Sequence, residues 1–219
     1  FTWLIRSRNN NKKQRVTQEL FTQQLLKTQE QERIKIARDL HDSVGQKLML
    51  LSRKAKNTAN SDMDILASTS LEELRSISRG LYPSVLERLG LTTAIEVLID
   101  EVDRNTDIFF SYEIDNIDQL ISKEYALHFY RIIQESLSNL VKHSEAKAAS
   151  ITIEKNIKYI HTSIKDNGTG FDISDNKKLQ NSLGMKTLRE RTRMIHSKIN
   201  VMSILQKGTT VELFTPISS

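Results

Sequence analysis

The chain has 219 residues, of which 27% are charged and 38% are hydrophobic, and its formal net charge at pH 7 is +5. It contains no cysteine, which excludes disulfides and thiolate metal sites. The length is enough for two small domains of about 100 residues each. Apart from a basic run near the N-terminus, basic residues are spread among acidic ones along the predicted helices, so we expect no direct binding of nucleic acid.

The first fifteen residues combine a short apolar stretch with a basic run. The apolar stretch, residues 1–5, contains a tryptophan, and it is followed by Arg6, Arg8, Lys12, Lys13 and Arg15. Five residues cannot span a bilayer, which needs about 20, but they could be the trailing end of a transmembrane segment. An interfacial aromatic residue followed by basic residues would then place the remainder on the cytoplasmic side. A frayed terminus with ordinary surface charges is the alternative.

Residues 12–57 predict one long helix, because they contain no proline and a single glycine. Its first part has only a broken heptad, which indicates a weak coiled coil that could be a signalling connector or a plain linker. A regular apolar stripe follows, at the spacing of one buried helix face. The stripe consists of Ile36, Leu40, Val44, Leu48 and Leu51, and Ile34 and Ala37 widen it.

His41 lies at the edge of this stripe. Its neighbours one turn away, Ala37 and Gly45, are small, so we expect Gly45 to clear space for a reagent that approaches the imidazole. Neutral imidazole is a good phosphoryl acceptor, and Asp42 could hold its second nitrogen. Gln46 could position a water against a phosphorylated histidine. Alternatively, His41 and Asp42 are an ordinary exposed pair.

A polar cluster at residues 56–61 predicts a turn, after which Ser61 or Asp62 would cap a second helix that ends at Tyr82-Pro83. Two helices with one apolar stripe each cannot bury themselves well as a hairpin. We therefore expect two copies to pair into a four-helix bundle, which makes the chain a homodimer. A further helical pattern runs to residue 102, with a bend at residues 89–91 that could act as a hinge.

From residue 107 the periodicity changes to alternating strands and helices. We predict strands near residues 108–114, 149–155, 159–165, 200–205 and 209–215, and helices at about 122–143 and 185–196. This proportion predicts an α/β sandwich, so the fold class of the whole chain is α+β. We place the domain boundary at residues 103–107, with a helical connector and dimerisation domain at 16–105 and a second domain at 106–219.

The long helix of the second domain carries a polar stripe. Arg131, Glu135, Asn139 and His143 are four residues apart and so lie on one side. Asn139 offers an amide oxygen to Mg²⁺ and Glu135 a carboxylate for the water shell of the ion, because hard cations share oxygen ligands with nucleotide phosphates. Arg131, Lys142 and His143 could neutralise phosphate charge. A solvated helix face is the alternative.

Asp166 continues the core-facing row of the strand at 159–165, where an unpaired carboxylate would be expensive. An adenine amino group would satisfy it. Gly168 and Gly170 would let the backbone approach a ligand closely. The polar segment 171–182 could close as a lid over nucleotide. Gly184 precedes a helix, where free backbone N–H groups favour phosphate.

Several of these segments resemble the sequence motifs of one protein family, and they follow one another along the chain in the same order as in that family. Residues 131–143 look like the N-box and residues 166–171 like the first glycine box of the ATP-binding domain shared by histidine kinases, gyrase, Hsp90 and MutL. Residues 37–46 are similar to the phosphoacceptor box of NarL/DesK-type sensor histidine kinases, and residues 81–83 and 89–91 resemble the end of that family's second helix. The second glycine box, residues 181–185, has one glycine where many relatives have two.

The resemblance implies roles for individual residues. His41 would be the autophosphorylated residue and Asp42 its base or orienting partner. Asn139 would bind Mg²⁺, Glu135 would support the catalytic site, and Asp166 would recognise the adenine of ATP. The glycines of the two boxes would shape the pocket and the lid; they are Gly168, Gly170 and Gly184.

The resemblance also implies a two-component signalling protein, in the cytoplasmic portion of a bacterial inner-membrane protein anchored by an upstream segment. It would transfer phosphoryl groups to an aspartate on the receiver domain of a response regulator. Asp42 and Gln46 match the pattern for dephosphorylation of that regulator. Two other interpretations stay open: an ATPase or serine kinase with the same ATP-binding fold, and a non-enzymatic dimeric ATP-binding scaffold.

Overall fold

The computed structural model describes residues 2–58, 60–172 and 183–217. The chain forms two compact units, Phe1–Ser84 and Val85–Ser219. The division comes earlier than the boundary expected at residues 103–107, because the helix at 91–104 belongs to the second unit. The apolar face of that helix is part of the core of this unit, where Leu91, Ile95 and Ile99 are buried.

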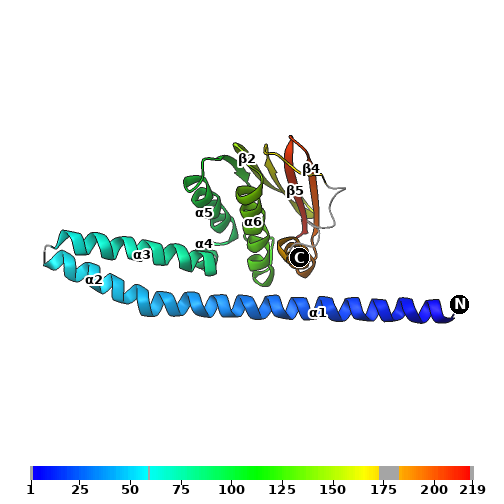
Figure 1. The fold of residues 1–219 in the computed structure, drawn as a ribbon, viewed down its shortest axis with the longest axis horizontal. Helices are drawn as coiled ribbons and strands as arrows, with labels where there is room; N and C mark the ends of the chain where they lie inside the picture. The colour runs from blue at the N-terminus through cyan, green and yellow to red at the C-terminus, as the bar shows by residue number, and fades with distance from the viewer. Residues whose placement is uncertain (1, 59, 173–182, 218–219) are drawn as a thin grey trace. The chain divides into compact units, whose positions relative to one another are not determined.

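The first unit is a helical hairpin. α1 (Thr2–Asp39), η1 (Leu40–Gly45) and α2 (Gln46–Asn57) run on as one helix, and α3 (Ser61–Leu81) returns beside α2 (Figure 1). Asn60 caps α3, since its side-chain oxygen accepts from Met63 N at 3.1 Å, so the cap precedes the expected Ser61 or Asp62. Within the described residues, no helix has the length and apolar character needed to cross a membrane.

The π-helical segment η1 surrounds His41 and was not predicted from the sequence. In it, the Ser43 hydroxyl donates to the Asp39 carbonyl at 2.5 Å. A serine that bonds to the carbonyl four residues earlier disturbs regular helical geometry, which gives a local reason for the wider turn. Single π-helical turns within α-helices are frequent at functional sites.

Small residues form the inner face of the hairpin. Ala37, Ala55 and Ala67 are buried, and so is Gly45. A Cβ on Gly45 would lie 3.4 Å from Leu74 Cδ2 of α3. Gly45 therefore faces α3 rather than open space beside His41, which corrects the expectation that it clears room for a reagent there.

The expected apolar stripe lies only partly on this inner face: Ala37 is buried, Ile34, Leu40 and Leu48 are half-buried, and the other members are exposed. Ile36, Val44 and Leu51 are 43%, 40% and 47% exposed, although their spacing predicted a buried face. Alanines at the hairpin interface bring the two helices together without using these larger side chains. The hairpin thus leaves an apolar surface open along its first helix.

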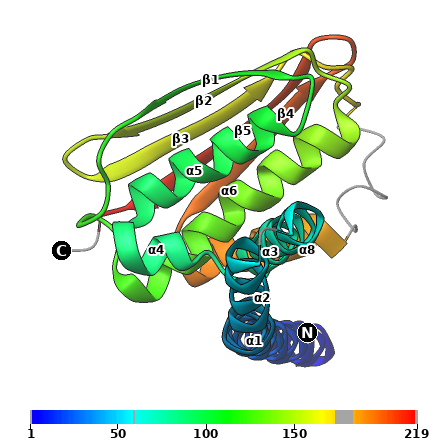
Figure 2. The same ribbon diagram turned by 90° about the vertical axis from the view of Figure 1, so that its left-hand side faces the viewer.

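The second unit is a mixed sheet covered by helices. Its elements are α4 (Ser84–Leu89), α5 (Leu91–Arg104), β1 (Phe109–Ile114), α6 (Lys123–His143), β2 (Ala148–Lys155), β3 (Tyr159–Asp166), α8 (Leu183–Met194), β4 (Lys198–Ile204) and β5 (Gly208–Pro216). The strand order is β1-β2-β3-β5-β4, with β1 parallel to β2 and the other pairs antiparallel. α5 and α6 cover one face of the sheet (Figure 2). This confirms the predicted sandwich of helices on a sheet.

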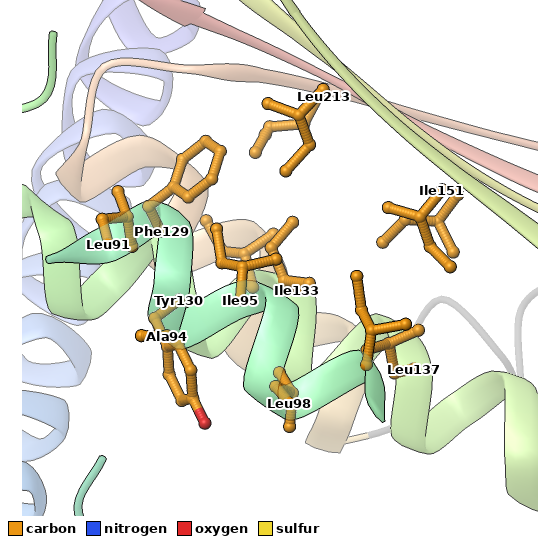
Figure 3. Packing of buried hydrophobic residues seen from close by; sticks show 14 of the residues in the cluster. Leu91, Ala94, Ile95, Leu98, Phe129, Tyr130, Ile133, Leu137, Ile151 and Leu213 are labelled. Atoms are coloured by element: carbon orange, nitrogen blue, oxygen red, sulfur yellow. The ribbon is translucent and has the colours of Figure 1, made fainter. Parts of the chain in front are cut away.

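The core lies between this helical layer and the inner face of the sheet. Ile95 of α5 and Ile133 of α6 are almost fully buried among side chains that include Ile151 of β2 and Leu213 of β5 (Figure 3). The same alternation that buries Ile160 and Ile164 of β3 carries Asp166 to the end of the inner row. The core therefore fixes where this carboxylate lies.

The bend at residues 89–91, where we expected a possible hinge, is the start of α5 and is bonded to Asp118. Gly90 has φ +90°, and a Cβ there would lie 2.7 Å from the Asp118 carboxylate. Asp118 Oδ1 accepts from Thr92 N at 2.8 Å, in the first turn of α5. A carboxylate at this end of a helix satisfies a free N–H and complements the helix dipole.

Shortening one core side chain should measure how strongly the second unit depends on this packing. Ile95→Ala is expected to reduce the free energy of unfolding by about 3 kcal/mol, because Ile95 is fully buried. The control is Ile157→Ala, since Ile157 is 96% exposed and should change stability by less than about 0.5 kcal/mol. Urea unfolding followed by circular dichroism measures both, and equal effects would contradict the assigned core.

Candidate functional site

A cavity of about 540 Å³ opens in the second unit between the C-terminal half of α6, the end of β3 and the β4–β5 pair. Its size is within the range of small-molecule sites. It is lined by Ser136, Asn139, Leu140, His143, Ser144, Ile164, Asp166, Gly170, Phe171, Met185, Leu188, Val201, Thr209 and Val211.

Asp166 supplies a buried carboxylate to this cavity. Asp166 is 5% exposed, and its Oδ1 accepts a hydrogen bond from Gly168 N at 2.9 Å. A carboxylate has about four acceptor positions, so this single bond leaves acceptor capacity toward the cavity. The position at the end of the inner row of β3 confirms the sequence prediction.

The loop that follows Asp166 is pressed against the end of α6. A Cβ on Gly168 would lie 2.0 Å from the Ser144 carbonyl oxygen, which also accepts from Thr169 N at 2.7 Å. We expected Gly168 to allow close approach of a ligand, whereas the structure shows that it allows close approach of two protein backbones. The loop is therefore held in one place beside the cavity.

The polar stripe of α6 reaches the cavity only in part. Asn139 and His143 line it, and Asn139 Nδ2 donates to Glu135 Oε1 at 3.5 Å. Arg131 is 3% exposed and donates to Gln134 Oε1 at 2.6 Å, and it does not line the cavity. Lys142 is exposed and does not line it either. The structure therefore leaves His143 as the member of the expected phosphate-neutralising set that faces this cavity.

Gly184 belongs to the first turn of α8 rather than to the segment before it. A Cβ on Gly184 would lie 2.6 Å from Glu135 Oε1, so the missing side chain lets α8 approach this carboxylate. Met185 and Leu188 of the same helix line the cavity. Most of the predicted lid, residues 173–182, lies outside the described residues, and so do Asn181 and Ser182 of the second glycine box.

His41 forms a separate candidate site in the first unit. Its side chain is 73% exposed, and its Nδ1 lies 3.2 Å from Asp42 Oδ1. An ionised carboxylate can only accept, so this bond requires a proton on Nδ1 and leaves the lone pair on Nε2 for reaction. Gln46 is exposed at the start of α2. The pair that the sequence predicted is thus present, on an imidazole ring that is open to solvent.

Sequence reasoning missed the wall of the cavity that β5 provides. Thr209 lines it, directly after Gly208, which has φ +87°. A Cβ on Gly208 would lie 2.0 Å from the Asp166 carbonyl oxygen. A glycine immediately before a predicted strand was the available signal, but the sequence does not show which loop that glycine approaches.

Comparisons with known proteins connect both parts of the chain with histidine kinases. Residues 124–219 match the family of histidine kinase-, DNA gyrase B- and HSP90-like ATPases, and residues 32–86 match a histidine kinase family. The chain is 31% identical over 200 residues to the sensor histidine kinase LiaS of Bacillus subtilis, a match that covers 85% of the chain and 54% of LiaS. It is 28% identical over 218 residues to the oxygen sensor histidine kinase NreB of Staphylococcus carnosus, covering 94% of the chain and 62% of NreB. The chain thus spans little more than half the length of these relatives.

Solved structures support the fold. The histidine kinase domain of a blue-light activated histidine kinase from Erythrobacter litoralis aligns with a TM-score of 0.57 at 12% identity, covering 84% of this chain and 94% of that domain. A longer chain of the same kinase aligns with a TM-score of 0.55 at 14% identity, covering 79% of this chain and 59% of the other. At such identities the likeness concerns the arrangement of the backbone.

Crowding the glycine loop should damage the cavity. Gly168→Ala is expected to weaken ATP affinity at least about ten-fold, because the new methyl group overlaps the Ser144 carbonyl and must displace the loop. Gly80→Ala is the matched control, since a Cβ there meets nothing within 4 Å. Fluorescence titration with a labelled ATP analogue, displaced by ATP, measures the affinity. Unchanged affinity in Gly168→Ala would contradict this site.

Proposed function

The chain belongs to the sensor histidine kinases, with a phosphoacceptor domain followed by an ATP-binding domain, and from this premise we propose that it transfers the γ-phosphoryl group of Mg-ATP to His41. The observation that carries the proposal is the exposed His41 ring, whose Nδ1 is held by Asp42 while Nε2 stays open. A histidine in this state is a nucleophile without a further base. The phosphoryl group would then pass to an aspartate on the receiver domain of a response regulator.

The ATP would occupy the cavity of the second unit. Asp166 would accept from the exocyclic amino group of adenine, which satisfies a carboxylate that is otherwise expensive to bury. The apolar walls beside it, including Ile164 and Val211, suit the faces of a flat aromatic base. His143, at the last turn of α6, would be available to the phosphates.

Mg²⁺ fits the donors at the α6 side of the cavity. Asn139 and Glu135 offer oxygen atoms and lie within hydrogen-bond distance of each other. Among the described residues no group of three or more acidic, histidine or cysteine side chains could hold a metal by itself. This suits an ion that takes few protein ligands and shares the phosphates of its nucleotide. When bound, Mg²⁺ neutralises phosphate charge; Asn139 would hold it, and Glu135 would act through its water shell.

The transfer itself would depend on positioning. The lone pair of His41 Nε2 forms the new P–N bond, and the bond from the γ-phosphorus to the bridging oxygen breaks, so that ADP leaves with that electron pair. Asp42 keeps the ring oriented and stabilises the positive charge that develops on it. For this step the ATP-binding unit must approach the hairpin, and we place the flexible connection at Tyr82-Pro83, between α3 and α4.

The exposed apolar stripe supports a homodimer. Ile36, Val44 and Leu51 lie on the first helix, outside the hairpin interface. A second copy would cover them in a four-helix bundle, which removes apolar side chains from water on both subunits. The phosphoacceptor histidines would remain on the outside of such a bundle, because His41 is already exposed at the edge of this stripe.

The exposed surface around His41 would bind the response regulator. Asp42 directly follows His41, and Gln46 lies about one helical turn after Asp42. Both residues are exposed. A glutamine amide there would position a water against the regulator's phosphoaspartate, which gives the chain phosphatase activity as well.

The basic residues near the start of the chain, such as Arg6 and Arg8, would favour a place beside the anionic inner face of a bacterial membrane.

Labelling with ATP that carries radioactive phosphorus at the γ position tests the proposed chemistry. The wild-type chain should acquire label that is labile in acid and stable in base. His41→Gln should bind ATP as before and acquire no label, because its fold and nucleotide cavity do not involve the imidazole. Asn139→Ala should lose at least about 90% of the label, since its oxygen would hold Mg²⁺.

Each interpretation predicts a different pattern in this assay. Label that persists on His41→Gln would indicate another acceptor, as in a serine kinase of the same ATP-binding fold. ATP binding without label in the wild-type chain, even with a phosphorylated regulator as donor, would indicate a scaffold.

The oligomeric state tests the proposed bundle. Leu51→Glu should shift the chain from dimer to monomer, weakening the dimer at least about ten-fold, because a charge would replace an apolar side chain in the buried seam. Arg53→Glu is the control, since it lies about 200° further around the same helix. Sedimentation velocity across a concentration series measures the shift. A wild-type chain that stays monomeric at all concentrations would contradict the proposal.

A further inference from the structure

The β4–β5 hairpin holds the loop that follows Asp166 through backbone contacts. Gln206 N, in the turn of this hairpin, donates to the Thr169 carbonyl at 2.6 Å. Gly170 has φ +58°, and a Cβ there would lie 2.2 Å from the Ile204 carbonyl oxygen. The loop is thus closed in by α6 on one side and by the hairpin on the other, and neither contact leaves room for a side chain.

One side chain adds to this grip. The hydroxyl of Ser203, on β4, accepts from Phe171 N at 2.8 Å. The same oxygen lies 3.2 Å from the Gly208 carbonyl and 2.9 Å from Thr209 Oγ1. A hydroxyl has one hydrogen and two lone pairs, so three partners at these distances use its full bonding capacity. Ser203 is 8% exposed, which keeps water from replacing these bonds.

Two of the three partners of Ser203 line the cavity, whereas Ser203 itself does not. Phe171 and Thr209 both line the cavity, from the loop after β3 and from the start of β5. If the hydroxyl is removed, the buried part of this network keeps an N–H and an oxygen without their partner. The two cavity walls would then be free to move relative to each other.

We propose that Ser203 is a positioning residue of the nucleotide site, which fixes the Phe171 backbone against Thr209 so that the cavity is formed before ATP enters. This inference rests on the proposed binding of ATP in that cavity. A binding site that is preorganised loses less conformational freedom when its ligand binds. Ser203 should therefore influence affinity for nucleotide without touching it.

The test compares Ser203→Ala with Ser197→Ala in the full chain. Ser197 is a matched control, because its hydroxyl donates to Thr215 Oγ1 at 2.8 Å and also links the β4 end to β5, but far along the strands from the cavity. Ser203→Ala should weaken ATP affinity about five- to ten-fold in calorimetric titration, as expected for a lost buried hydrogen bond. Ser197→Ala should lower the melting temperature and leave ATP affinity unchanged.

Two more variants separate positioning from general stability. Ser203→Thr retains the hydroxyl and should keep affinity within about two-fold of the wild-type value. Ser203→Cys replaces the oxygen with a larger sulfur that is only a weak donor and acceptor, and it should lose affinity as Ser203→Ala does. Hydrogen exchange of the peptide that contains Phe171 should accelerate in the alanine and cysteine variants before any ATP is added.

A failure of the proposed ATP binding and a failure of the proposed role of Ser203 would give different results. Absence of ATP binding in the wild-type chain would contradict the proposed function itself. Wild-type binding together with unchanged affinity in Ser203→Ala, or in Ser203→Cys if the alanine variant does not fold, would overturn the role of Ser203. An equal loss of affinity in Ser197→Ala would overturn it too, because any weakening of the β4–β5 pair would then suffice.

Discussion

The cavity of the second unit depends on the burial of the Asp166 carboxylate. The strand alternation that buries Ile160 and Ile164 also turns Asp166 inward, and the residue is 5% exposed. Among the residues that the structure describes, one N–H, from Gly168, bonds to it. A charge in such a place needs further hydrogen bonds to be stable. The surrounding architecture supplies a cavity in which a ligand can provide them.

Glycines at fixed positions make this arrangement possible. Gly168 allows the loop to press on the end of α6, Gly170 allows it to meet β4, and Gly208 allows β5 to meet the Asp166 backbone. A Cβ added at any of these three positions would clash with backbone atoms of another segment. Backbone atoms cannot move aside as the end of a flexible side chain can. The rigidity of the cavity therefore comes from backbone packing, while the hydroxyl of Ser203 ties its two walls together.

Much of this could be predicted from the sequence, because local patterns report on local structure. Helical periodicity located α3 and α6, alternation located β2 and β3, and the inner row of β3 identified Asp166 as a buried polar residue. Adjacency alone predicted the pairing of His41 with Asp42. These features depend on residues that are near one another in the chain.

Features that depend on distant partners could not be predicted in the same way. The role of Gly45 depends on Leu74 of another helix, and the burial of Arg131 depends on the packing around α6. α5 looked like a continuation of the hairpin, since its helical pattern does not state which layer it will cover. Thr209 and Ser203 were missed because a threonine and a serine in a strand carry no signal of their own.

Calorimetric titration of the wild-type chain with ATP and with GTP, under identical conditions, shows whether the buried Asp166 carboxylate selects adenine. Adenine presents an amino donor where guanine presents a carbonyl acceptor, and a buried carboxylate can bond only to the donor. We expect saturable binding of ATP and at least about a hundred-fold weaker binding of GTP. Equal affinities for the two nucleotides, or no binding of ATP, would contradict this role of Asp166.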